Sequence, residues 1–462
     1  MVKVNISGRG KLLDLLIEEG IPIPATCGGK GRCGHCRVRI TGKIKKPNRI
    51  EKVLIPASLI KSGYRLACQY RVERGVRILL SRRANPGRIA GANGLALDLG
   101  TTMLKGAVVD LKKGGVVRRE SVENPQISLG GDVLTRIDLA LSGRYQQLRR
   151  LLFGGIDRLG QRLGIRKPLF TTVVGNPVML SFFLNRSVKG LAGYPFQADV
   201  EGGLLARPPR YVFPIIGGFV GGDTIAGILA TGLYRKRFGI YIDLGTNGEV
   251  ALVKKGRIYA VSTAAGPAFE GSGLSWGCQA VPGAIDQVFY RNGLKYHTIG
   301  RKKPTGICAS GYIDLLAVLL EEGHLSEDGR LRKRTVLAGF EITQADIRSL
   351  QLAIGAIHAG IETLLDHYQV SSKDIEMVVI TGEFGSHLNP KSLKRVGILP
   401  RGIGSVEFEP DLPLKGAIQV LLDLERIEEV ERIRRRSRQL ELALQHGFQE
   451  RFVKAMLLRP WD

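Results

Sequence analysis

The chain of 462 residues is long enough for several domains, and with 44% hydrophobic and 24% charged residues its composition is that of a folded globular protein. The formal net charge is +26, spread along the chain except for a dense arginine run over residues 432–438. This charge would suit an acidic protein, a nucleic acid or an anionic membrane, and a solvated surface explains it equally well. No window reaches the roughly 18 apolar residues of a membrane helix, and no secretory signal follows Met1, so we expect a cytoplasmic protein with no membrane partner.

The first 80 residues carry signals of a small sheet with one helix. Residues 2–6 alternate apolar and polar side chains, which predicts a strand, and residues 12–19 predict a short amphipathic helix. Residues 38–40 and 76–80 are typical of further strands. Together with a loop that could hold a metal cluster, this is the layout of a β-grasp ferredoxin.

That loop lies between the predicted helix and the next strand and is rich in cysteine and glycine. Its cysteines have the spacing C-x5-C-x2-C, with a fourth 32 positions on, and the four candidate cluster ligands are Cys27, Cys33, Cys36 and Cys68. Three thiolates on one glycine-rich loop and a distant fourth are typical of a plant-type [2Fe–2S] site, with one extra residue in the first gap. A structural zinc site is the alternative, but zinc modules usually have two C-x2-C pairs and this chain has one. We therefore predict an α+β ferredoxin domain over residues 1–83 and a linker over residues 84–93.

Two later segments resemble each other, each with an apolar strand that ends in aspartate, a tight turn and a second strand. The aspartates are Asp98 and Asp243, 145 residues apart. The turn residues predicted to surround phosphates are Gly100, Thr101, Thr102, Gly245, Thr246 and Asn247. Aspartate at a strand end can hold hydrated Mg²⁺. The repeat predicts two half-domains that face each other across a nucleotide, with a boundary near residues 233–240.

Two further segments fit this arrangement. Residues 377–385 predict a strand that runs into a turn, where Gly382, Phe384 and Gly385 would contact adenosine. Asp223 begins a helix of small residues and is our candidate for orienting the attacking water, with an N-cap role as the alternative. This helix and a second small-residue stretch over residues 414–417 could act as a hinge.

The ATP-binding pattern resembles the acetate and sugar kinase, heat-shock chaperone and actin superfamily, the ASKHA fold. With the cluster domain in front, the chain resembles the reductive activators of corrinoid-dependent enzymes. The blocks that carry this resemblance are residues 124–126, 130–133, 174–179, 262–271, 306–311 and 342–348. The resemblance implies an α/β ATPase of the actin-like, duplicated RNase H-like type over residues 94–424. It also implies that an unidentified low-potential donor reduces the cluster, and that ATP with Mg²⁺ drives electron transfer to cob(II)amide on a corrinoid protein, giving cob(I)amide.

The chain also departs from that family's pattern. Glu383 replaces a glycine, Leu180 and Ser181 replace frequent histidines, and the middle domain of longer relatives is expected to be missing. Residues 425–462 are expected to form a basic helix or tail outside the ATPase. Within residues 262–277, hydroxyls such as those of Thr263, Ser272 and Ser275 could reach the partner's cofactor, or the segment could be a turn that closes the cleft.

Two other functions stay open at this level. One is a small-molecule kinase on the same fold, and the other is a ferredoxin-type electron carrier whose second part is a non-catalytic docking domain. Cys278 and Cys308 are expected to be core thiols, because a second cluster would need more ligands. The sequence does not favour a nucleic-acid partner and leaves a homodimer open.

Overall fold

The computed structural model describes residues 2–18, 36–55, 57–80, 93–165, 167–200, 202–205, 209–245, 247–271, 273–382 and 388–462. Among the helices in these ranges, none combines the length and the apolar character that crossing a membrane requires.

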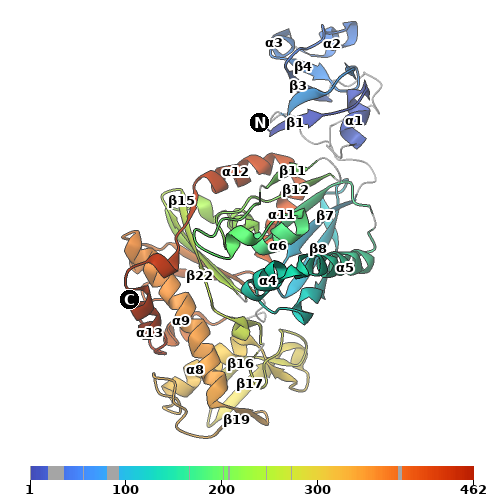
Figure 1. Cartoon of the computed structure of the whole chain (residues 1–462). Helices are drawn as coiled ribbons and strands as arrows, with labels where there is room; N and C mark the ends of the chain where they lie inside the picture. The colour runs from blue at the N-terminus through green and yellow to red at the C-terminus, as the bar shows by residue number, and fades with distance from the viewer. Residues whose placement is uncertain are drawn as a thin grey trace.

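The N-terminal domain contains a four-stranded sheet in the order β1-β6-β3-β4 and a small β2–β5 pair. Figure 1 shows β1, β3 and β4 of this domain together with its helices. Its elements are β1 (Val2–Ile6), β2 (Gly10–Lys11), α1 (Leu12–Glu18), β3 (Arg37–Thr41), α2 (Arg49–Leu54), α3 (Ala57–Lys61), β4 (Tyr64–Leu66), β5 (Arg71–Val72) and β6 (Val76–Leu80). The alternation of residues 2–6 thus gives a strand, as predicted, and the amphipathic segment gives α1. Leu12 and Leu16, one turn apart on α1, pack with Ile40 and Ile78 of the sheet in this domain's own core.

The larger part of the chain contains two six-stranded sheets, which match in the topology of five strands and differ in the place of the sixth. The first runs β11-β12-β10-β7-β8-β9 and the second β22-β21-β13-β14-β15-β23. The strands of the first are β7 (Asn93–Leu99), β8 (Met103–Asp110), β9 (Gly115–Glu123), β10 (Thr171–Gly175), β11 (Gly203–Leu205) and β12 (Arg210–Val212). Those of the second are β13 (Phe238–Leu244), β14 (Gly248–Lys254), β15 (Arg257–Thr263), β21 (Met377–Gly382), β22 (Ser405–Phe408) and β23 (Ser437–Gln439).

In both sheets three consecutive antiparallel strands are followed by two strands parallel to the first of them. This repeated connectivity confirms the predicted duplicated, RNase H-like fold. The hairpin β7–β8 has β13–β14 as its counterpart, so the two phosphate turns recur at the same place in each sheet.

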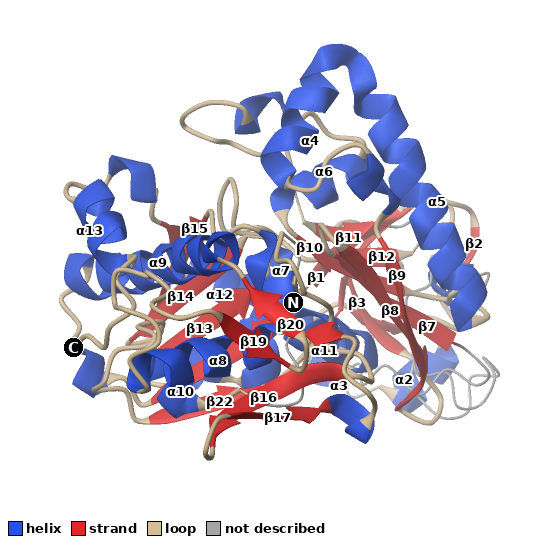
Figure 2. Cartoon of the chain, turned by 90° about the horizontal axis from the view of Figure 1, so that it is seen from below, coloured by secondary structure: helices blue, strands red, loops and turns tan. Residues whose placement is uncertain are grey.

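Helices cover the outer faces of the sheets and fill the space between them (Figure 2). The first sheet's outer face carries α4 (Val133–Leu139), α5 (Tyr145–Leu163) and α6 (Pro177–Leu184), and the second sheet's core includes α8 (Ala309–Glu321), α9 (Gln344–His367) and α10 (Pro390–Arg395). Between the sheets lie α7 (Gly222–Thr231) and α11 (Leu412–Leu422), whose side chains share one core with residues of both sheets. Gly416 of α11 lies so close to α7 that a Cβ would collide with the carbonyl oxygen of Ala226. The predicted pair of small-residue helices is therefore closely packed.

An additional lobe is inserted between β15 and β21, beside α8 and α9 (Figure 1). It contains a three-stranded sheet and a two-stranded sheet. Their strands are β16 (Ala284–Tyr290), β17 (Leu294–Thr298), β18 (Gly306–Ile307), β19 (Thr335–Leu337) and β20 (Phe340–Ile342).

The C-terminal segment corrects the prediction of a basic helix outside the ATPase. It forms α12 (Ile427–Arg435), the strand β23 and α13 (Phe448–Ala455), and β23 pairs in parallel with β15 of the second sheet. The prediction was wrong because charge hid an amphipathic pattern: Ile427, Val430 and Ile433, three residues apart, are all buried.

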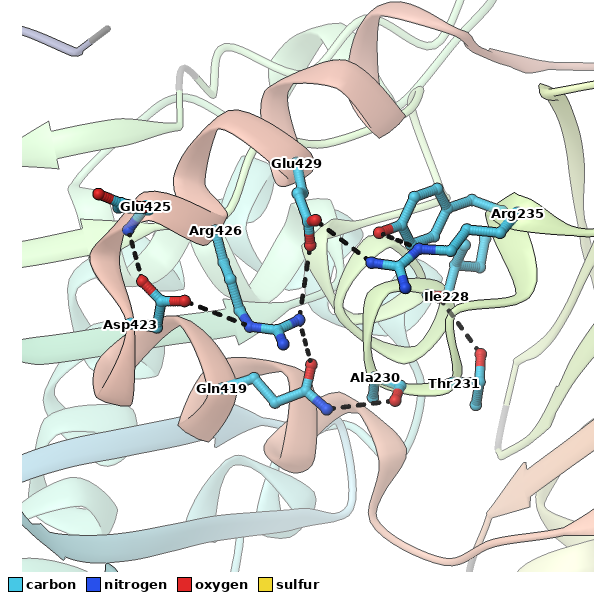
Figure 3. A network of polar contacts seen from close by, with 10 residues as sticks. Ile228, Ala230, Thr231, Arg235, Gln419, Asp423, Glu425, Arg426 and Glu429 are labelled. Atoms are coloured by element: carbon cyan, nitrogen blue, oxygen red, sulfur yellow. Dashed lines mark hydrogen bonds and ion pairs between the residues drawn. The ribbon is translucent and has the colours of Figure 1, made fainter. Parts of the chain in front are cut away.

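Polar contacts also attach α12 to the two helices between the sheets, as Figure 3 shows. Arg426 donates to Gln419 of α11 at 3.2 Å and to Glu429 of α12 at 3.5 Å. Glu429 in turn accepts from Arg235, which follows α7, at 3.3 Å. The segment is therefore an integral part of the ATPase fold.

Candidate functional site

The two hairpin turns line one cavity between the sheets. Its volume is about 110 Å³, enough for a few water molecules or a phosphate group. Of the predicted site residues, the structure brings together here Asp98, Gly100, Thr101, Thr102, Asp223, Asp243, Gly245, Asn247 and Gly382. Thr246, Phe384 and Gly385 lie outside the described residues, as does Glu383.

Most of the charged side chains that line this cavity are carboxylates. The pKa of Asp223 is raised to about 7 by burial and by the nearby charge of Asp98. Burial and Asp223 likewise raise the pKa of Asp243 to about 7, against the opposing effect of Lys105. Glu249, which pairs with Asp243 across β13 and β14, has its pKa raised well above its ordinary value by burial and by the same two aspartates. Such an acidic site has a strong preference for a cation.

The structure rejects the N-cap role for Asp223. Helix α7 begins at Gly222 with Gly221 as its N-cap, and Asp223 lies inside the first turn. Its Oδ1 accepts a hydrogen bond from the backbone N–H of Thr224 at 2.8 Å, while the side chain lines the cavity. Gly221 is required at the cap, because a Cβ there would collide with the carbonyl oxygen of Gly175.

The first turn is supported by Asn124 and Asn176, which belong to the blocks that carry the family resemblance, and by Arg136, three residues beyond the block 130–133. The buried Arg136 donates to the carbonyl oxygen of Thr101 at 2.7 Å, and Asn124 donates to that of Gly100 at 2.9 Å. Asn176 donates to the hydroxyl of Thr101 at 3.0 Å. A Cβ at Gly100 would collide with the carbonyl oxygen of Met103. The turn is therefore held in one shape, with space that only glycine leaves open.

Two polar contacts link the elements on either side of the cavity. Thr102 Oγ1 donates to Glu270 Oε2 at 2.6 Å, which connects the first turn to η5 (Pro267–Glu270) after β15. Lys105 Nζ lies 2.7 Å from Asp411 Oδ1, just before α11. Both contacts join segments far apart in the sequence and contribute to holding the cleft closed.

Several residues of this cavity escaped the sequence analysis. They are Lys105, Glu249 and Asp411, while Asn176 and Glu270 were included only as members of the blocks 174–179 and 262–271 and not as site residues. A signal existed for two of them, because Lys105 pairs with Asp98 and Glu249 pairs with Asp243 at the same place in the duplicated hairpins. Aligning the two repeats residue by residue would have identified this position. Asp411 gives no such signal, since only the fold brings it to the cavity.

Two of the four predicted cluster cysteines lie in the described part of the chain. Cys36 directly precedes β3 and Cys68 follows β4 by two residues. Because Arg37 pairs with Leu66 in these antiparallel strands, the two cysteines come to the same end of the sheet. Both are buried, and the N–H of Ala67 donates to the carbonyl oxygen of Cys36 at 2.8 Å. Cys27 and Cys33 lie outside the described residues. Two thiols brought together from separate elements suit the ligand set of an iron–sulfur cluster.

The structure separates the residues of the 262–277 block. Thr263 is buried, and its hydroxyl donates to the carbonyl oxygen of Gly248 at 3.0 Å, so it cannot reach a partner's cofactor. Ser275 is held by its N–H, which donates to Asp346 Oδ1 at 2.7 Å. With Glu270 bound to Thr102, these contacts favour the cleft-closing turn. Ser272 lies outside the described residues.

Of the two remaining cysteines, Cys308 agrees with the expectation of a core thiol, whereas Cys278 does not belong to the core. Cys308 is fully buried and donates to the carbonyl oxygen of Ile285 at 3.3 Å. Cys278 is half-buried, and burial together with the nearby Cys308 raises its pKa to about 11. A thiol with such a pKa stays protonated and is a poor metal ligand.

The fold and the site together define a class of protein: an actin-like ATPase of the ASKHA type preceded by a ferredoxin domain. Comparison with protein families supports each part. Residues 2–73 match the 2Fe–2S iron–sulfur cluster binding domain, residues 93–236 match the RACo middle region, and residues 237–462 match the C-terminal domain of RACo, described as the ASKHA domain. The chain belongs to the family of reductive activators of corrinoid-dependent enzymes.

Individual relatives agree with this assignment. The chain is 28% identical to the corrinoid activation enzyme RamQ of Eubacterium limosum, over 86% of this chain and 88% of that protein. It is 26% identical to the [Co(II) methylated amine-specific corrinoid protein] reductase of Methanosarcina barkeri, over 73% of this chain and 71% of the relative. Its structure matches that of a reductive activator for a corrinoid, iron–sulfur protein with a TM-score of 0.73 and 25% identity, over 98% of this chain and 96% of the other.

These matches correct two expectations. The middle domain is not missing, since residues 93–236 match the family's middle region and carry the first sheet. The C-terminal segment, which the sequence analysis could not relate to the family, lies within the match that ends at residue 462.

Proposed function

We propose that this chain couples ATP binding and hydrolysis to the one-electron reduction of a corrinoid on a partner protein. Cys27, Cys33, Cys36 and Cys68 would hold a [2Fe–2S] cluster, and this cluster would supply the electron that converts cob(II)amide to cob(I)amide. This proposal rests on one observation. The same chain has a domain that matches a 2Fe–2S binding module and, after it, a domain with a cavity between duplicated phosphate turns. An external low-potential donor would restore the cluster's electron after each transfer.

The proposed roles are assigned from the residues of the duplicated turns and of the strand–turn segment at 377–385. Backbone N–H groups and hydroxyls of the turns at 100–102 and 245–247 bind the phosphates, and Gly382, Phe384 and Gly385 contact adenosine. Among the described residues, no three acidic, histidine or cysteine side chains converge to hold a metal ion by themselves. Asp98 and Asp243 would therefore position Mg²⁺ through its water molecules and the phosphates, as this ion prefers.

Asp223 is the proposed group that orients the attacking water. It is the carboxylate on α7, the helix between the two sheets, and its pKa of about 7 suits a proton acceptor at neutral pH. Hydrolysis breaks the bond between the β- and γ-phosphates and adds water to the γ-phosphorus, and Asp223 takes the proton that the water releases.

The test combines the chemically reduced protein, Mg-ATP and a cob(II)amide protein, and follows cob(I)amide by absorbance. We expect reduction with ATP and a far smaller extent without it. Reduction that is equally fast and complete without ATP would refute the coupling. ATP-dependent phosphorylation of sugars or acyl acids, measured in parallel and exceeding simple hydrolysis, would support a kinase instead.

A further inference from the structure

A second cavity, separate from the nucleotide cleft, is lined by cationic side chains. It has a volume of about 490 Å³ and is lined by Lys255, Arg257, Tyr259, Arg435, Arg436 and Arg438, which we call the basic cleft. Strand β15 starts here at Arg257 and ends at Thr263, whose partner Gly248 adjoins the nucleotide cavity. At about 3.3 Å per residue, the two cavities are roughly 20 Å apart along this strand.

The walls of the basic cleft are fixed by regular backbone contacts. One wall is the tight β14–β15 turn, where Gly256 has a φ of 77°. The other is the end of α12 and the strand β23, which is joined to β15 by the bond from the N–H of Ile258 to the carbonyl oxygen of Arg436 at 3.0 Å. The Arg436 guanidinium lies against Gly256, where a Cβ would come within 3.3 Å of its Nη1. The cationic side chains therefore project from a rigid frame built by two distant segments.

The charge of the basic cleft is not neutralised within the described part of the chain. No acidic side chain lines it, and none of its five cations forms an ion pair with another described residue. Nearby, burial and then the charge of Arg438 lower the pKa of Arg434, against the opposing effect of Glu431. Like charges close together on a surface repel one another, and a bound anion would offset this repulsion.

The character of the basic cleft points to one class of anion. Sites for small molecules are mostly apolar and enclose their ligand, whereas these five cationic side chains are all exposed. Single-stranded nucleic acids use open aromatic faces, and one face of Tyr259 is covered by Tyr368 at a ring distance of 3.6 Å. Exposed arginines on a fixed frame suit carboxylates on a protein surface, which they steer and orient.

We propose that the basic cleft binds an acidic segment on the surface of the corrinoid partner protein. This inference rests on the proposed function for the partner's identity and adds where and by what chemistry the partner docks. It also assigns a binding role to some of the residues that make up the net charge of +26.

The test reverses two charges in the basic cleft with Arg257→Glu/Arg436→Glu. The control is Arg150→Glu/Arg158→Glu, which makes the same change in net charge at exposed positions of α5. The readouts are the KM for the corrinoid protein and the kcat of its ATP-dependent reduction, with basal ATP hydrolysis and thermal melting as checks on folding. We expect KM to rise ~10-fold at low salt in the cleft variant only, the difference to shrink at high salt, and kcat and basal hydrolysis to stay unchanged. The milder Arg257→Gln/Arg436→Gln should raise KM less.

A direct binding measurement separates this proposal from the proposed function. Fluorescently labelled poly-glutamate should bind wild type and the control but not the cleft variant, and this result does not depend on any corrinoid activity. An unchanged KM, or an equal rise in the control, would overturn the docking site. With the nucleotide cavity saturated by Mg-ADP, tighter binding of inorganic triphosphate or of single-stranded DNA than of poly-glutamate would overturn the choice of an acidic protein segment. If wild type binds poly-glutamate but reduces no corrinoid protein, the proposed function fails and the anion site remains.

Discussion

Replacing Asp223 with asparagine should lower the rate of ATP hydrolysis and raise the stability of the folded protein. The change keeps the shape of the side chain but removes both a proton acceptor and a charge among the cavity carboxylates. We expect ATP hydrolysis to fall by ~10²- to 10⁴-fold, the range typical of a lost general base. ATP binding should change little, because the proposed phosphate contacts come from the turns.

The stability effect can be worked from the pKa. The pKa of Asp223 is about 7 in the folded protein against 3.8 ordinarily, and this difference corresponds to about 4 kcal/mol at ~1.4 kcal/mol per pH unit. Because the folded pKa is the higher one, the folded state keeps a proton that the unfolded chain releases between about pH 4 and 7. The ionised carboxylate therefore lowers stability progressively across that range, and the full cost is present above pH 7. Water and counter-ions in the cavity reduce it, so we expect about 1–3 kcal/mol.

The assay is thermal melting of the nucleotide-free, metal-free protein at several pH values, alongside steady-state hydrolysis. Asp223→Asn should melt a few degrees higher than wild type at pH 8, and the two should converge below about pH 4. Asp157→Asn, at an exposed position of α5, is the control and should change neither property. Hydrolysis within about threefold of wild type would refute the catalytic role. A lower melting temperature at pH 8 would refute the electrostatic reasoning.

Three further substitutions test the cluster site, the first phosphate turn and the packing of α7 against α11. Cys68→Ser should lower the iron and sulfide content of anaerobically purified protein while ATP binding stays intact; unchanged iron, or stoichiometric zinc without sulfide, would contradict the cluster assignment. Arg136→Met should lower the free energy of unfolding by ~3 kcal/mol and weaken ATP binding, because the carbonyl oxygen of Thr101 loses its buried donor. Gly416→Val should destabilise by ~2–3 kcal/mol and slow hydrolysis, since α11 must move away from α7. Gly154→Val, with no atom within 4 Å of the added Cβ, is its control in urea unfolding, and equal effects of the two would contradict the close packing of α7 and α11.

The sequence allowed the prediction of those strands and turns that depend on a short local pattern. The strand–turn repeat around Asp98 and Asp243 predicted one hairpin in each sheet, because two copies with matched flanks are far stronger evidence than a single such turn. The support that the first turn receives could not be predicted, because Arg136 and Asn176 reach it only through the fold.

The prediction for the C-terminal segment was wrong, and it shows what a local sequence pattern can hide. Its many charges concealed three buried apolar positions, and β23 is too short to give an alternating pattern. Its place beside β15 depends on long-range pairing, which a local reading of the sequence does not contain. The sequence left two roles open for the segment that contains Thr263, and the choice depends on the same kind of long-range pairing, since its partner Gly248 comes from the neighbouring strand.

The arrangement of helices suggests how the nucleotide and the partner protein communicate. Asp223 lies on α7, which packs against α11 without spare volume, and Asp411 precedes α11 at the cavity. Helix α12 is attached to both through Arg426 and Glu429, and its last residues form one wall of the basic cleft. A shift of α7 and α11 on nucleotide binding would therefore move the proposed docking site directly. Moving an electron uphill by 100 mV costs about 2.3 kcal/mol, which equals a difference of roughly 50-fold in affinity between two states. The close packing of α7 against α11 suits them to transmit an affinity difference of this size. A closely packed interface changes between discrete arrangements and does not deform gradually.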